Sequence, residues 1–185
     1  MTNFTVDWFS NNIPHWQIHL AKFKTYKHLG VLEIGVFEGM ATKWLLENIC
    51  PHNTQYIAID PFVDFDGFNA GKAENFRKNI GRDPRVMLVT ETSRVALRRY
   101  GDETKDIIYI DGSHHSREVM YDSVICFDLL RVGGVMIFDD YLWDMKLPEV
   151  EKPKIAIDLF LDMYRGKYKL LHQGYQVIIE KIENC

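Results

Sequence analysis

Two strand-like runs of the sequence end in carboxylates, and a histidine follows one of them closely. Asp111 ends the first run, and the pair Asp139 and Asp140 ends the second. Ligands gather at the carboxyl ends of parallel strands, so these acids converge if the two strands are neighbours. Carboxylate oxygens suit Mg²⁺, and His114 could take a proton from a hydroxyl near neutral pH. The spacing therefore predicts a site where a divalent cation and a general base meet.

Structural roles would account for the same residues. Carboxylates at strand ends can cap the helices that follow, and His114 could bond to backbone at a helix start. His115 is expected to be structural or exposed. Tyr141 and Trp143, just past the acid pair, either line a pocket or form a packed rim.

A glycine turn lies upstream of these acids. Residues 31–34 read as a buried strand, and Gly35 and Gly39 follow it, ahead of apolar residues at helical spacing from residue 40. Asp60 ends another strand-like run twenty-one positions after Gly39, where an acid can accept both hydroxyls of a ribose. The pattern predicts a nucleoside-binding unit, although glycines that only solve a packing problem would look the same.

The glycine spacing and two flanking acids argue against a dinucleotide. The dinucleotide fingerprint is G-x-G-x-x-G, with a helix N-terminus aimed at a pyrophosphate. Here three residues separate Gly35 from Gly39, and Glu33 and Glu38 flank the turn. Two carboxylates would repel a pyrophosphate, so the turn suits a ligand with a cationic end and no phosphate.

This stretch resembles motif I of the class I methyltransferases that use S-adenosylmethionine (SAM), and Asp60 resembles their ribose-binding acid. The resemblance implies SAM as the cofactor, and implies that the loop after the strand at 86–89 lies near its adenine. The cofactor-binding residues that this resemblance implies are Glu33, Gly35, Phe37, Gly39, Thr42, Asp60, Pro61, Phe62, Thr92, Ser93, Asp111 and His114. Ala41 replaces a serine that often holds the SAM carboxylate, so this contact must come from Thr42 or backbone.

The three acids make the resemblance more specific. Asp111, with Asp139 and Asp140 beginning twenty-eight residues later, looks like the metal triad of Mg²⁺-dependent O-methyltransferases. Catechol O-methyltransferases usually carry an Asp-Asn pair and a lysine base, whereas macrolide-sugar and cephalosporin-biosynthesis relatives have an Asp-x-x-His loop and an acid-acid pair, as here. Residues 106–141 also resemble the methyltransferase type 24 family. The resemblance implies these three acids as metal ligands, His114 and Asp111 as catalytic residues, and a sugar or small-molecule hydroxyl as the acceptor.

The rest of the sequence predicts the elements that position these residues. A helix at 14–26 would cover the sheet or form part of a lid. Helices at 72–80, 93–100, 113–130 and 152–164 alternate with strands at 56–60, 86–89, 106–111 and 135–138. Runs at 168–171 and 175–182 predict a closing antiparallel hairpin. The loop at 61–71 carries Phe62, Phe65 and Phe68, which would shield a nucleoside or anchor the loop.

These elements predict an α/β fold: a doubly wound, Rossmann-like, seven-stranded sheet, mostly parallel, with a C-terminal antiparallel hairpin, as in class I methyltransferases. We expect one domain over residues 1–185, with 1–30 as a helical cover and 31–185 as the core. The length of 185 residues and the 46% hydrophobic content fit a chain that folds alone.

Composition limits the partners. The net charge of −4 argues against nucleic acid. No apolar run approaches the ~18 residues that cross a bilayer, and the first five residues lack signal-peptide features. The three cysteines contain no C-x-x-C and favour a reduced setting. We therefore expect a cytoplasmic protein without nucleic-acid or membrane partners.

The sequence thus predicts a SAM-dependent, Mg²⁺-assisted O-methyltransferase that acts on a sugar or small molecule. A catechol-type O-methyltransferase, a nicotinamide-linked oxidoreductase and a non-catalytic SAM-binding module are the alternatives. The missing third glycine and the closing hairpin argue against the oxidoreductase, and the retained acids with His114 argue against the module. The acceptor stays open, as does whether the chain is a homodimer or one module of a larger biosynthetic protein.

Overall fold

Strands and helices alternate along most of the chain. The computed structural model describes residues 4–63, 71–143 and 146–185, so Phe65 and Phe68 of the 61–71 loop lie outside the described residues. The strands are β1 His28–Ile34, β2 Asn53–Ile59, β3 Val86–Val89, β4 Lys105–Ile110, β5 Leu130–Phe138, β6 Tyr168–Gln173 and β7 Val177–Lys181. The α-helices are α1 Ile13–His19, α2 Met40–Asn48, α3 Lys72–Ile80, α4 Ser93–Ala96, α5 Ser116–Leu129 and α6 Pro153–Met163.

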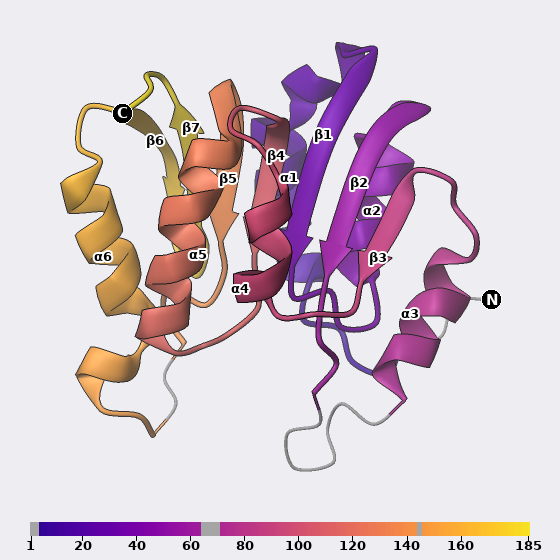
Figure 1. Cartoon of the computed structure of the whole chain (residues 1–185), viewed down its shortest axis with the longest axis horizontal. Helices are drawn as coiled ribbons and strands as arrows, with labels where there is room; N and C mark the ends of the chain where they lie inside the picture. Colours follow the sequence, from indigo (N-terminus) through magenta and orange to yellow (C-terminus); the bar gives the residue numbers. More distant parts are fainter. Residues whose placement is uncertain (1–3, 64–70, 144–145) are drawn as a thin grey trace.

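The strands form one sheet in the order β3-β2-β1-β4-β5-β7-β6 (Figure 1). β1 to β5 pair in parallel, whereas β7 pairs antiparallel with both β5 and β6. This confirms the predicted fold class, including the closing hairpin. Because β4 and β5 are parallel neighbours, the acids after them lie at the same edge of the sheet.

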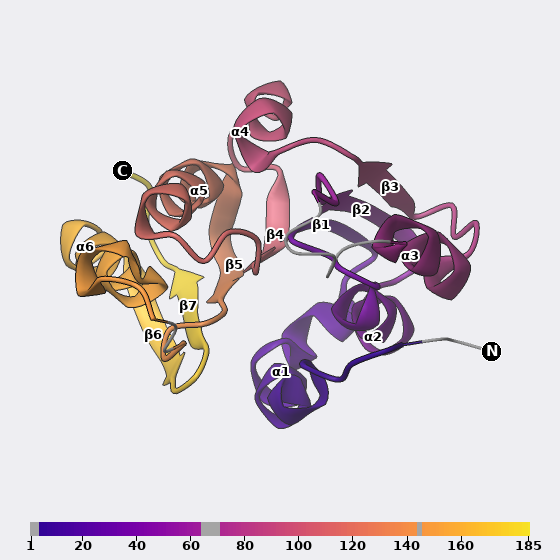
Figure 2. The ribbon, with the colours of Figure 1, turned by 90° about the horizontal axis from the view of Figure 1, so that it is seen from below.

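Helices cover both faces of the sheet, with α1, α2 and α3 on one side and α4, α5 and α6 on the other (Figure 2). Each face has its own hydrophobic core. Leu29 and Val31 of β1 pack with the first set of helices, while Leu32 and Ile34 pack with the second. A strand covered on both faces needs apolar residues at successive positions, which explains the run at the start of the glycine turn.

Several predicted boundaries are wrong. The sequence predicts a helix over 113–130 and a strand over 135–138, which leaves Gly133 and Gly134 between the two elements. In the structure, α5 starts at Ser116 and ends at Leu129, and β5 begins at once with Leu130, which pairs with Lys105 of β4. The glycines therefore lie within a strand, and His114 lies in the loop before the helix. This long-range pairing overrides the local signal of the glycines.

The N-terminal boundary also differs. The helix predicted at 14–26 is α1 followed by a 3₁₀ turn at Ala21–Thr25, and β1 starts at His28, so Gly30 belongs to the strand. Among the described residues, no helix combines the length and apolar character that spanning a membrane requires. The division into a 1–30 cover and a 31–185 core stays a prediction.

Candidate functional site

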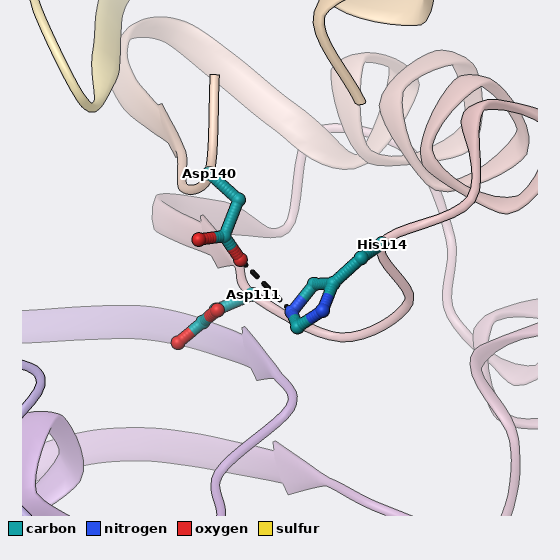
Figure 3. A group of neighbouring side chains, drawn as sticks. All are labelled: Asp111, His114 and Asp140. Carbon is teal, nitrogen blue, oxygen red and sulfur yellow. Dashed lines mark ion pairs between the residues drawn. The ribbon is translucent and has the colours of Figure 1, made fainter. Parts of the chain in front are cut away.

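Three acids gather at the carboxyl ends of β4 and β5, and we call Asp111, Asp139 and Asp140 the acid cluster. The backbone N–H of Asp139 donates to the carbonyl of Ile110, 2.9 Å away, which ties the two strand ends together. The loop after β4 brings in His114, whose Nε2 lies 2.9 Å from Oδ2 of Asp140 (Figure 3). Ligand atoms from Asp111, His114 and Asp140 all lie within 4.8 Å of one another.

Asp139 faces a different set of partners. Its Oδ2 accepts hydrogen bonds from the Tyr109 hydroxyl and from Nε2 of Gln176, the latter at 2.8 Å. Its Oδ1 accepts the backbone N–H of Asp140, also at 2.8 Å. The side chain is therefore held by protein donors on both oxygens, and its predicted role as a metal ligand stays a prediction.

The acid cluster carries more negative charge than its surroundings balance. Burial, together with the nearby carboxylates of Asp139 and Asp140, raises the pKa of Asp111 well above its ordinary value. The Tyr109 hydroxyl also contacts Oδ2 of Asp111 at 2.9 Å, and its single proton can serve one of its two acid partners at a time. Among the described residues, the cation-forming side chain paired with these acids is His114 rather than a lysine or arginine.

This charge pattern fits a divalent cation. Closely spaced carboxylates in a low-dielectric site need a shared proton or a positive ion. Oxygen-rich sites with few nitrogen donors suit Mg²⁺ or Mn²⁺. Asp111 and Asp140 are the acids best placed to hold such an ion, because their oxygens converge in space with the imidazole of His114.

The glycine turn lies directly against this cluster. Gly35 has a φ of 81°, and a Cβ added there would lie 1.9 Å from the carbonyl oxygen of Asp111. Asp60 holds the other side of the turn, since its Oδ2 accepts the backbone N–H groups of Val36 and Phe37 at 3.0 Å each. The predicted nucleoside-binding unit and the predicted metal site are therefore adjacent.

Two hollows meet at this place and share Asp111 in their walls. The turn hollow has an empty volume of about 410 Å³, its open mouth included, and the acid hollow has about 230 Å³. The acid hollow is bounded by the acid cluster, His114 and Pro153. The turn hollow is lined by Val6, Trp8, Phe9, Glu33, Gly35, Val36, Phe37, Met40, Ala41, Tyr109 and Asp111.

Sequence reasoning missed part of this lining. Trp8 and Phe9 come from the segment before α1, and Tyr109 lies inside β4, where it reads as one more apolar strand residue. The only local signal for Tyr109 is its position two residues before Asp111, which places both side chains on the same face of a strand.

Glu38 in the turn and Thr42 in α2 are both held by protein partners. Glu38 is 1% exposed and accepts hydrogen bonds from the backbone of Thr5 at 2.6 Å and from Lys72 Nζ at 3.0 Å. Thr42 is fully buried, and its hydroxyl donates to Glu33 at 2.5 Å. Neither side chain lines the turn hollow, and the contact of Thr42 with a ligand carboxylate stays a prediction.

The remaining predicted cofactor residues follow the carboxyl ends of β1, β2 and β3, at the same edge of the sheet. Gly39 precedes α2 with a φ of 83°, and a Cβ there would lie 2.8 Å from the Phe76 ring. The backbone N–H of Phe62 donates to Oδ1 of Asp60 at 2.7 Å, and Pro61 joins the two. Ser93 begins α4, and Thr92 before it makes no side-chain capping bond. Their contacts with a cofactor stay predictions.

Gly35→Ala should destabilise the fold more than Gly133→Ala does. Both glycines have a φ slightly above 80°, but a Cβ at Gly133 meets nothing within 4 Å. The left-handed backbone alone should cost an alanine about 1–2 kcal/mol. The overlap with the carbonyl of Asp111 should add about 1–3 kcal/mol at Gly35. Urea unfolding of the two variants measures the difference, and equal losses would contradict this close approach.

Glu33 should make stability fall as pH rises. Burial raises the pKa of this carboxyl from 4.5 to about 7, even though the hydroxyls of Thr42 and Tyr56 bond to it. A pKa that is higher in the folded state means that ionisation between pH 4.5 and 7 weakens the fold. Relative to wild type, Glu33→Gln should gain about 3 kcal/mol across this range. Urea unfolding from pH 5 to 8 tests this, with the exposed Glu47→Gln as the control, and parallel pH profiles for Glu33→Gln and wild type would contradict it.

The chain matches known proteins in sequence and in fold. A sequence profile described as a methyltransferase domain matches residues 32–141. An uncharacterised protein of Acanthamoeba polyphaga mimivirus is 31% identical over 157 residues, which cover 76% of this chain and 63% of the viral protein. The chain thus spans less than two thirds of this relative's length.

Solved structures share the fold at low sequence identity. The O-methyltransferase TomG of Streptomyces achromogenes, solved in complex with SAM, has a TM-score of 0.68 at 16% identity, over 92% of this chain and 80% of TomG. MycE, a methyltransferase of the mycinamycin biosynthetic pathway solved with Mg, S-adenosylhomocysteine (SAH) and mycinamycin VI, has a TM-score of 0.64 at 18% identity. That match covers 96% of this chain and 50% of MycE. The chain belongs to the methyltransferase domain family and has the class I methyltransferase fold.

Proposed function

We propose that this chain is a SAM-dependent O-methyltransferase, assisted by Mg²⁺, that acts on a hydroxyl group of a sugar or another small molecule. The observation that carries the proposal is that Asp111 lines both hollows. The turn hollow lies on one side of Asp111, and the acid hollow with His114 lies on the other. A methyl donor in the first hollow and a hydroxyl in the second would meet there.

The turn hollow suits SAM in its position and charge. Gly35 lets the turn pack against the carbonyl of Asp111, which brings the hollow beside the acid cluster, and Asp60 ends β2, where an acid can accept ribose hydroxyls. When bound, SAM supplies the methyl group on a positively charged sulfonium. Glu33 and Asp111 line the hollow with carboxyl groups, and the sulfonium charge beside them would favour their ionised forms. TomG and MycE, which share this fold, were solved with SAM and SAH respectively.

The acid cluster would hold the metal through Asp111 and Asp140, with Asp139 as the third predicted ligand. When bound, Mg²⁺ supplies positive charge that lowers the pKa of a nearby hydroxyl and offsets the charge of the acids. MycE was solved with Mg, which supports this proposal by analogy of fold.

His114 would take the proton from the acceptor hydroxyl. Its Nε2 pairs with Oδ2 of Asp140 at 2.9 Å, which leaves Nδ1 as the ring atom that would accept the proton. Asp140 would stabilise the imidazolium that forms. The Trp143 ring, with its centre 4.3 Å from that of His114, restricts how the imidazole can turn. The side chain of His114 is 38% exposed, so an acceptor can reach it from solvent.

The acceptor class rests on the Asp-x-x-His loop, and a catechol-type acceptor is the alternative. We further propose that the protein is cytoplasmic and has no nucleic-acid or membrane partner. We also propose that it works either as a homodimer or as one module of a larger biosynthetic protein. MycE and the viral relative both extend well beyond the matched region.

The test is methyl transfer from isotope-labelled SAM to a panel of sugars, glycosides and catechols. We expect a labelled product on a hydroxyl group, loss of turnover with EDTA, and its recovery with added Mg²⁺. Turnover that chelation leaves unchanged would remove the role of the metal. If the chain binds SAM but transfers no methyl group to any hydroxyl, the SAM-binding module becomes the better account.

A further inference from the structure

A series of buried hydrogen bonds connects α1 to the acid cluster. The indole N–H of Trp16 donates to Oε1 of Gln176 at 2.8 Å, and Nε2 of Gln176 donates to Oδ2 of Asp139 at 2.8 Å. The Tyr109 hydroxyl bonds to the same Oδ2 and lies 2.9 Å from Oδ2 of Asp111. Trp16 is fully buried, and Gln176 and Tyr109 are each 2% exposed. None of these three residues was among the predicted site residues.

The partners of Gln176 fix the direction of its amide. An indole N–H can only donate, so the amide oxygen has to face Trp16. The amide nitrogen must then face Asp139, a carboxylate that can accept from it. Gln176 therefore has one favourable orientation, and Trp16 selects it.

The register of the sheet explains why Gln176 meets Asp139. Phe138 of β5 pairs with Val177 of β7 in the antiparallel ladder. In such a ladder the residue after Phe138 lies opposite the residue before Val177. The closing hairpin thus carries Gln176 to the end of β5, where the acids begin.

Asp139, which Gln176 holds in place, in turn holds the backbone of Asp140. Its Oδ1 accepts the backbone N–H of Asp140, whose φ of 57° is uncommon for a residue other than glycine. This backbone turn aims the Asp140 carboxylate at His114 (Figure 3). A shift of Asp139 would therefore move an oxygen that the proposed metal site depends on.

We propose that Gln176, oriented by Trp16, is a positioning residue for a divalent-cation site formed by Asp111 and Asp140. This inference rests on the proposed function, in which the acid cluster holds the metal. Gln176 would act through Asp139 and would not itself be a ligand of the metal. Removing a group that holds a metal ligand in place typically weakens metal binding about 10-fold to 100-fold.

The test compares Mn²⁺ binding by Gln176→Leu and Gln173→Leu, using the electron paramagnetic resonance signal of free Mn²⁺ and no other ligand. Mn²⁺ takes the same oxygen ligands as Mg²⁺. Gln173 is the matched control, because it lies on the same hairpin and its amide bonds to the Tyr141 hydroxyl at 3.0 Å instead. We expect Mn²⁺ affinity to fall about 10-fold or more in Gln176→Leu and to stay within about twofold of wild type in Gln173→Leu.

Trp16→Phe provides a second variant if Gln176→Leu folds poorly. It removes the indole N–H but keeps an aromatic ring, so the amide of Gln176 loses the partner that fixes its direction. We expect a smaller loss of Mn²⁺ affinity and SAM affinity within about twofold of wild type. If Gln176 and Trp16 had a purely structural role, the two variants would have a lower free energy of unfolding, and the Mn²⁺ affinity of the folded protein would be unchanged.

The outcomes separate this inference from the proposed function. If wild type binds Mn²⁺ and Gln176→Leu binds it equally well, the positioning role is wrong and the proposed metal site stands. If wild type binds no Mn²⁺, the metal part of the proposed function fails, and this inference fails with it.

Discussion

Asp140→Asn is expected to lower the rate of methyl transfer about 100-fold or more and to weaken Mg²⁺ binding with it. The Asp140 carboxylate bonds to Nε2 of His114 and accepts a hydrogen bond from the Tyr175 hydroxyl at 3.0 Å. Removing its charge takes an anionic oxygen from the metal site and the counter-charge from the imidazolium. Losses of a few kcal/mol in transition-state stabilisation correspond to rate changes of this size.

Asparagine suits this test because it fits the backbone. Asp140 has a φ of 57°, a conformation in which asparagine is among the most tolerated residues. The free energy of unfolding should therefore stay close to that of wild type. The exposed Asp162→Asn, whose carboxylate pairs with Arg165, is the control for the loss of one negative charge. Unchanged turnover in Asp140→Asn would contradict both the metal site and the role of the acid pair.

His114→Ala is expected to lower kcat about 100-fold to 10,000-fold, the usual range for losing a general base. The neighbouring His115→Ala is the matched control, because His115 is exposed and should leave kcat unchanged. The two measurements together separate removal of a catalytic imidazole from a general effect of changing this loop.

The same variant separates two roles that the geometry allows for His114. The imidazole lies close enough to Asp111 and Asp140 to be a metal ligand as well as a base. A base predicts a fall in kcat with Mn²⁺ affinity within a few-fold of wild type, whereas a ligand predicts that Mn²⁺ affinity falls too. Wild-type kcat in His114→Ala would rule out the base.

The architecture was largely predictable because its signals are local. The strand, glycine turn and helix around Gly35 follow from a continuous apolar run, a glycine and helical spacing. The closing hairpin follows from two strand-like runs joined by a short turn. The meeting of Asp111 with Asp139 also followed, once β4 and β5 were taken as parallel neighbours.

What the sequence could not supply depends on long-range pairing. Gln176 reads as an unremarkable polar residue, and it gains its position only from the register of β7 against β5. Glu38 reads as an acid facing a ligand, but Lys72 and Thr5 reach it from distant parts of the chain. The start of β5 at Leu130 depends likewise on its pairing with Lys105, so the strand predicted at 135–138 begins too late.

The most direct test of the account is a calorimetric titration of SAM into the purified protein, with NAD as the comparison ligand. The account predicts micromolar binding of SAM, no comparable binding of NAD, and loss of SAM binding in Asp60→Ala. This variant would lack the carboxylate that contacts the ribose and that accepts the backbone N–H groups of Val36 and Phe37. Absence of SAM binding by wild type, or tighter binding of NAD, would contradict the account at its base.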